Sequence, residues 1–119
     1  MKNIKFSLLF IFIFLAGCVQ KAHVKTVMVT LTIPGKKNIE QVGIRGNGNP
    51  LNWEQDYPMT ALIKDSVYTA SFKTRTAFQY TEIKFTVNGE WELAEQPNRK
   101  VYYESNKDTV FIQAVFNQP

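Results

Sequence analysis

Short stretches in which every second residue is apolar follow one another along the chain after Cys18, and none has the periodicity of an amphipathic helix. The stretch from Val27 to Ile33 alternates in this way, and Pro34-Gly35 ends it. Asn88-Gly89 separates two further stretches, and this dipeptide is the strongest short-range signal for a two-residue hairpin turn. The pattern therefore restricts the chain to half-buried strands joined by tight turns.

The expected strands are separated at regular intervals by residues that favour turns. They cover residues 27–33, 42–44, 59–63, 67–73, 78–87, 90–93, 101–103 and 109–116. About seven or eight short strands with this spacing predict an all-β fold, an antiparallel β-sandwich of the immunoglobulin-like type. The 119 residues suit one domain of ordinary size.

The N-terminal segment differs from the rest because it carries the features of an export signal. Lys2 and Lys5 give it positive charge, and residues 6–15 are apolar apart from Ser7. This apolar run is too short to cross a bilayer comfortably as a helix, and it fits the hydrophobic region of a secretory signal.

The run at 15–18, Leu-Ala-Gly-Cys, resembles the lipobox of bacterial lipoprotein signals. The resemblance implies cleavage before Cys18 and lipid on its thiol, which would anchor the protein to a membrane. An ordinary signal peptide with an incidental cysteine, or a short uncleaved anchor, are the alternatives. We expect a signal peptide at 1–17, a lipidated Cys and polar tether at 18–26, and one domain at 27–119. The expected location is the bacterial cell envelope, at the outer membrane or the periplasmic face.

Charge and residue usage exclude several classes of partner. Loss of Lys2 and Lys5 with the signal lowers the formal net charge from +4 to +2, and the remaining basic residues are scattered. Nucleic acid is not an expected partner, because nucleic-acid binders carry a basic stripe. One Cys and one His cannot supply a disulfide or a conventional metal cluster, so we expect no metal and no cofactor.

Groups suited to catalysis are equally scarce. His23 lies in the expected tether, Cys18 would carry lipid, and the chain has no Gly-rich phosphate loop. Glu90, Glu92 and Glu95 could form the carboxylate pair of a glycosidase, but carboxylates on a hairpin edge are usually solvated. We therefore expect a protein that is not an enzyme.

The hairpin at Asn88-Gly89 places a large aromatic ring on the outside of the sheet. A two-residue turn pairs Thr86 with Trp91, and alternation puts Lys84 on the same face. The opposite face carries the residues of the expected core, which are Ile83, Phe85 and Val87. Trp91 is thus expected on the solvent side, diagonal to Lys84.

Trp53, the other tryptophan, follows the Gly/Asn/Pro loop at 46–50. A sugar ring packs its C–H bonds against a flat indole, while its hydroxyls need hydrogen-bond donors and acceptors nearby. Two indoles with a Lys ammonium and an Asn amide would supply both kinds of contact. The alternative is that the two rings serve only in core or rim packing.

Three blocks of the sequence resemble carbohydrate-binding domains. The run 83–91, Ile-Lys-Phe-Thr-Val-Asn-Gly-Glu-Trp, resembles the Tyr-Lys-Phe…Asp-Gly-x-Trp hairpin of glycogen-binding domains in the β-subunits of AMP-activated protein kinase. The run 51–54, Leu-Asn-Trp-Glu, resembles the Asn-Trp or Gly-Asp-Trp-Glu element of these domains and of glucoamylase starch-binding domains. Trp-Glu at 91–92 with Pro-Asn-Arg at 97–99 is similar to the Trp-Glu…Asp-Pro-Asn-Arg run of the starch-binding group.

The resemblance implies a non-catalytic, lipid-anchored module that binds an α-glucan such as starch, glycogen or a maltooligosaccharide. In such domains two tryptophans form a platform for consecutive glucose units of a curved α-1,4 chain. Carried over to this sequence, Trp53 and Trp91 form the platform. Lys84 and Asn98 are then the polar contacts, and Glu92 is a further contact.

A second function is compatible with the same residues, because aromatic side chains at the rim of a sandwich also anchor protein interfaces. In this alternative the chain is a lipid-anchored β-sandwich that binds a protein partner in an envelope complex. Its aromatic anchors would be Trp53, Tyr57, Trp91, Tyr102 and Tyr103. In either case we expect Arg99 to pair with an acidic neighbour.

Overall fold

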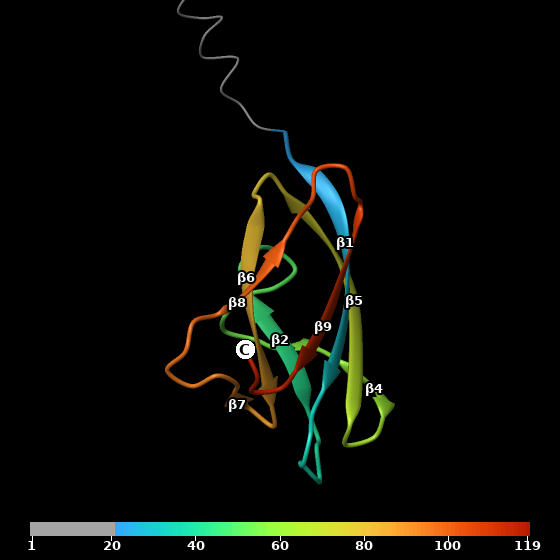
Figure 1. The fold of residues 1–119 in the computed structure, drawn as a ribbon, viewed down its shortest axis with the longest axis vertical. Coiled ribbons are helices and arrows are strands. Elements are labelled where there is room, and N and C mark those ends of the chain that lie inside the picture. Colours follow the sequence, from blue (N-terminus) through green and yellow to red (C-terminus); the bar gives the residue numbers. More distant parts are fainter. Residues whose placement is uncertain (1–20) are drawn as a thin grey trace, which may run out of the picture.

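The computed structural model describes residues 21–119, which form nine strands in two facing sheets (Figure 1). The predicted signal peptide at 1–17 and Cys18 lie outside the described residues. Among residues 21–119 we find no helix with the length and hydrophobicity needed to cross a membrane. The all-β prediction is confirmed, with nine strands in place of seven or eight.

The strands divide into two sheets, which we call sheet A and sheet B. Sheet A contains, in spatial order, β4 (Thr60–Ile63), β5 (Val67–Thr76), β1 (His23–Thr32) and β9 (Thr109–Val115). Sheet B contains β3 (Tyr57–Pro58), β2 (Val42–Gly46) and β6 (Tyr80–Val87), with β7 (Glu90–Trp91) and β8 (Arg99–Tyr102) both paired to β6. β6 is therefore the central strand of sheet B.

One pair of strands departs from the antiparallel arrangement of the rest. β9 runs parallel to β1, with Thr26 opposite Thr109 and Thr32 opposite Val115. Parallel neighbours need a long connection, and here the whole chain between β1 and β9 supplies it by passing through sheet B. Alternation within a strand carries no information about the direction of its neighbour, so the sequence pattern could not show this.

The hydrophobic core lies between the inward faces of the two sheets. Buried residues alternate along β1 and β6 as predicted, and they are Val27, Val29, Leu31, Ile83, Phe85 and Val87. Burial of each such side chain contributes roughly 1.5–3 kcal/mol relative to leaving it in water. Tyr80, Lys84 and Thr86 alternate with these core residues and therefore lie on the outward face of β6.

β1 begins earlier than expected, so the prediction of a tether is wrong for residues 23–26. His23 lies opposite Thr76 of β5, and Lys25 is buried. The Lys25 ammonium donates hydrogen bonds to the carbonyl oxygens of Glu104, over 2.9 Å, and Lys107. The polar residues of this segment are ordered because β5 is long enough to pair with them. The buried Lys25 ammonium is stabilised because backbone carbonyl oxygens accept its hydrogen bonds.

Candidate functional site

The hairpin at Asn88-Gly89 has the predicted register, with Thr86 opposite Trp91. The two turn residues have φ angles of 50° and 80°, which is the left-handed conformation that a type I′ turn requires. The Asn88 side-chain oxygen accepts hydrogen bonds from the backbone N–H groups of residues 40–41, so the turn is also tied to the segment before β2. Trp91 faces outward as expected and is 43% exposed.

Trp53 lies beside Trp91, and we call the two rings the tryptophan pair. Their centroids are 6.1 Å apart and their planes are inclined by 37°. Trp53 belongs to the loop between β2 and β3, and its indole N–H donates a hydrogen bond to Asn47 Oδ1 over 2.6 Å. The Asn52 side-chain oxygen accepts from the N–H groups of residues 54–55, which shapes the turn around Trp53. The tryptophan pair is therefore a partly exposed aromatic surface, and the hydrogen bond to Asn47 fixes the orientation of the Trp53 ring.

Arg45, which the sequence analysis did not identify, supplies the positive charge at the tryptophan pair. Its guanidinium carbon lies 4.8 Å from the centroid of the Trp91 ring, a cation–π stack. The same guanidinium donates to Asp56 Oδ1 over 2.8 Å and to the Trp53 carbonyl oxygen over 3.2 Å. Arg45 is an outward residue of β2, and only the pairing of β2 with β6 reveals that it points toward the hairpin.

Asp56 holds Arg45 in place. Its carboxylate also accepts hydrogen bonds from the Thr86 hydroxyl over 2.7 Å and from the Gln41 side-chain amide over 2.8 Å. Burial by itself would raise the pKa of Asp56, but the hydrogen bonds and the charge of Arg45 outweigh burial and lower that pKa below its ordinary value. Asp56 is therefore ionised at neutral pH and is a fixed partner for the guanidinium.

Gly43 provides the space in which Asp56 lies. A Cβ atom built on Gly43 would collide with the Asp56 side chain. Glycine inside a strand often marks a position where another segment approaches closely, and here that segment is the one that carries Trp53 and Asp56 over sheet B. In the sequence, a glycine inside the strand at Gly43 was the one signal that another segment passes over sheet B at this position.

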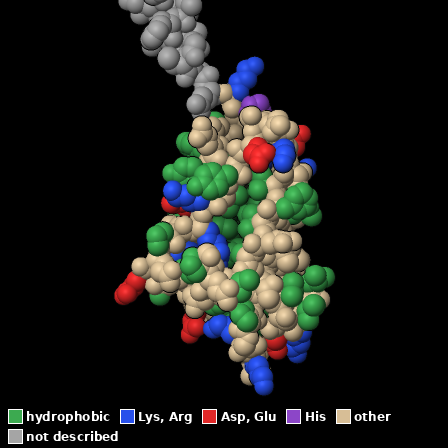
Figure 2. All heavy atoms as spheres, viewed as in Figure 1, with side chains coloured by type: hydrophobic (Ala, Val, Ile, Leu, Met, Phe, Trp, Pro, Cys, Tyr) green, Lys and Arg blue, Asp and Glu red, His purple; other side chains and the backbone are tan. Residues whose placement is uncertain are grey.

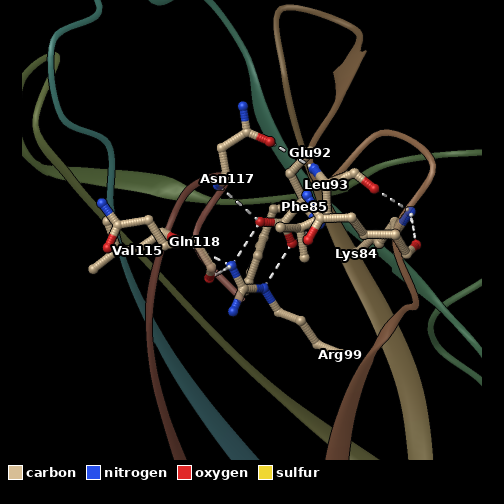
Figure 3. Close-up of polar contacts among 9 residues, drawn as sticks. Lys84, Phe85, Glu92, Leu93, Arg99, Val115, Asn117 and Gln118 are labelled. Atoms are coloured by element: carbon tan, nitrogen blue, oxygen red, sulfur yellow. Dashed lines mark hydrogen bonds and ion pairs between the residues drawn. The ribbon is translucent and has the colours of Figure 1, made fainter.

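Lys84 is held by the turn that follows β7, and its role as a polar contact stays a prediction. Its ammonium donates hydrogen bonds to the carbonyl oxygens of Leu93, over 3.0 Å, and Gln96, over 3.1 Å (Figure 3). Two of its three N–H donors are thus engaged by the turn that follows β7. Lys84 acts as a clamp on this turn, and Arg45 is the cation stacked on the tryptophan pair.

Glu92 is completely buried, so the prediction that it contacts a ligand is wrong. Its two carboxylate oxygens each accept a 2.8 Å hydrogen bond from Arg99 (Figure 3). The expected pairing of Arg99 with an acidic residue is confirmed. The reason for the burial is alternation: Trp91 faces outward, so Glu92 faces the core, where it accepts a hydrogen bond from the Phe85 N–H.

Asn98 is half-buried and lies directly before β8. The first residue of β8, Arg99, lies opposite Ile83, so Asn98 is close to β6 near the level of Lys84. Its role as a polar contact stays a prediction.

The five aromatic residues proposed as interface anchors differ in exposure. Tyr102 is 63% exposed, whereas Tyr57 and Tyr103 are half-buried against the core. The Tyr57 ring packs edge-on against Phe72 at 5.4 Å between centroids. Burial raises the pKa of Tyr103. Tyr57 and Tyr103 therefore contribute mainly to packing.

No family model matches this chain, and no curated protein matches it. The resemblance to starch- and glycogen-binding domains stays a prediction.

Proposed function

We propose that this chain is a lipid-anchored, non-catalytic module that binds α-glucan through the tryptophan pair. One observation carries the proposal: two indole rings from separate segments meet on the outer face of sheet B, with a guanidinium stacked on one of them. Single exposed apolar side chains are common on protein surfaces, whereas contiguous apolar patches mark binding sites. The two adjacent indole rings form such a contiguous surface.

The chemistry of the surroundings matches a sugar chain. The inclination of 37° between the rings suits a curved α-1,4 chain, in which consecutive glucose units face different directions. The Asn47 side chain uses its oxygen on Trp53, which leaves its amide N–H groups for sugar hydroxyls. Arg45 has further N–H donors beside the same rings. Binding at so shallow a surface is expected to be weak, because little of the ligand is buried.

Calorimetric titration with maltoheptaose tests the proposal. The full chain is kept in a detergent without a sugar headgroup, because a maltoside or glucoside detergent would compete for the site. We expect saturable binding by the unmodified chain and none by the double variant Trp53→Ala, Trp91→Ala, with the far-ultraviolet circular dichroism of the two proteins unchanged.

Phe111→Ala is the matched control for loss of an exposed aromatic ring. Phe111 is 74% exposed on β9 of sheet A, away from the tryptophan pair, so this variant should bind maltoheptaose normally. Absence of heat with maltoheptaose, glycogen and β-cyclodextrin would contradict the proposal. That result would favour the second candidate, a protein partner in the envelope, for which the exposed rings of Trp91 and Tyr102 on sheet B are suitable anchors.

A further inference from the structure

A second aromatic pair lies on the outer face of sheet B, and we call it the tyrosine pair. Tyr80 of β6 lies opposite Tyr102 of β8, with ring centroids 5.8 Å apart and planes inclined by 47°. The rings are 44% and 63% exposed. The Lys100 ammonium lies 4.9 Å from the centroid of the Tyr80 ring. This arrangement of two tilted rings with one stacked cation has the same parts as the tryptophan pair with Arg45.

The tyrosine pair and the tryptophan pair belong to the same face. Tyr80 and Thr86 alternate with the buried core residues of β6, so both point outward, and Thr86 lies opposite Trp91. From Tyr80 to Thr86 the strand rises roughly 20 Å, at about 3.3 Å per residue. The tryptophan pair extends back along the strand from the level of Thr86, because Trp53 donates to Asn47 and the Asn47 N–H donates to the Glu82 carbonyl oxygen. The gap between the two aromatic pairs is therefore shorter than this rise.

A groove lies beside Tyr80, at the end of β6 that carries the tyrosine pair. It is open, has a volume of about 490 Å³, and is lined by Asn47 and residues 77–82. Asn47 is the residue that holds the Trp53 ring, and Tyr80 is part of the same lining. Figure 2 shows hydrophobic side chains gathered beside a basic one over β8 and the adjoining part of β6. Polar and aromatic groups thus continue from the tryptophan pair along β6.

We propose that the tyrosine pair and Lys100 form a second carbohydrate subsite, and that the ligand is an extended glucan chain long enough to occupy both aromatic pairs. This inference rests on the proposed function of the tryptophan pair. Tyrosine rings stack on the C–H faces of sugars, and their hydroxyls and the Lys100 ammonium donate to sugar hydroxyls. A chain held at one shallow subsite binds the other at a high effective concentration, so chain length itself becomes the determinant of affinity.

The test compares maltotriose with maltoheptaose, which spans a greater length of the face. Both are titrated into the full chain in a detergent without a sugar headgroup. The unmodified chain should bind maltoheptaose at least about tenfold more tightly than maltotriose. In the double variant Tyr80→Ala, Tyr102→Ala most of this advantage should disappear, while maltotriose should still bind at the tryptophan pair.

Two further variants separate stacking from folding. Tyr80→Phe, Tyr102→Phe keeps the rings and should keep most of the preference for the longer chain. Lys100→Ala removes one exposed side chain, leaves the strand pairing intact, and should weaken maltoheptaose binding several-fold. Thermal unfolding of each variant confirms that the sandwich is intact.

The outcomes distinguish this inference from the proposed function. If the alanine double variant and Lys100→Ala bind maltoheptaose as tightly as the unmodified chain, the second subsite is overturned while the tryptophan pair stands. If the unmodified chain binds neither oligosaccharide, the proposed function fails and this inference fails with it.

Discussion

Sheet B carries two arginine–carboxylate pairs, one on each face, and they differ in what surrounds them. Glu92 is completely buried, and its oxygens accept four hydrogen bonds, all from groups of the protein. Arg45 and Asp56 lie on the outer face, with side chains 21% and 6% exposed, and Arg45 stacks on the half-exposed ring of Trp91. The chemistry of the two pairs is the same, but their neighbours are not.

The difference separates a pair that stabilises the fold from a pair that orients a surface. Arg99 joins Glu92 to the C-terminal segment, because its guanidinium also donates to the carbonyl oxygens of Val115 and Gln118. All of these partners are groups of the protein itself, so the pair holds the turn after β7 and β8 to the C-terminal segment. Arg45, in contrast, contacts both residues of the tryptophan pair. We expect substitutions to affect stability at the first pair and binding at the second.

The largest effect is expected from Glu92→Ala, which leaves the Arg99 guanidinium partly buried without its counter-ion. Loss of one partner of a buried pair costs about 3–5 kcal/mol of unfolding free energy. Urea unfolding followed by tryptophan fluorescence measures the change. Asp56→Ala is the matched variant at the other pair and should cost clearly less, so equal losses at the two positions would contradict the comparison.

Gly43→Ala should come next, because the new methyl group occupies the space of the Asp56 side chain. Steric overpacking of this kind typically costs about 1–3 kcal/mol. Displacement of Asp56 also releases Arg45 from its position at the tryptophan pair, so maltoheptaose binding should weaken together with stability. Calorimetry and urea unfolding of the same preparation show whether both change; a variant that loses neither would show that the crossing segment can shift freely.

Arg45→Ala should lower affinity for maltoheptaose several-fold and cost about 1–3 kcal/mol of unfolding free energy, because the Asp56 carboxylate, only 6% exposed, loses its counter-ion. Asp56 keeps its hydrogen bonds from Thr86 and Gln41, so the loss of stability should be smaller than in Glu92→Ala. Arg45→Lys is the matched control. It keeps the charge but loses the planar stack on Trp91 and the fork-shaped donor geometry, so it should restore only part of the affinity. Full restoration by lysine would show that charge alone matters at this position.

The smallest effect concerns pH and Asp56. Its pKa in the folded protein is lowered by its hydrogen bonds and by Arg45, in spite of the opposing effect of burial. A carboxylate with a lowered folded-state pKa adds stability above its unfolded-state pKa of about 3.9, and this contribution disappears as the pH falls through the folded-state value. Asp56→Asn should therefore flatten the fall in unfolding free energy below about pH 4. An unchanged acid profile would argue against an ionised Asp56.

Local patterns predicted much of the fold. Alternation identified the inward residues of β1 and β6, and the dipeptide at Asn88-Gly89 fixed the register that turns Trp91 outward. Both signals act within a few residues of the chain, where backbone geometry is dictated by the side chains themselves. The same alternation, applied one residue further, places Glu92 in the core, so its burial was available from the sequence.

Other features depended on contacts between distant segments. The sequence by itself determined most of the strands, the hairpin and the outward face of Trp91. Only the tertiary structure decided that Arg45 is the cation stacked on the tryptophan pair, that Lys84 clamps a turn, and that Tyr80 meets Tyr102. The physical reason is that alternation with a period of two residues decides which face of a strand a side chain lies on. Which side chains of other segments it contacts on that face depends on how the strands pair and the sheets pack.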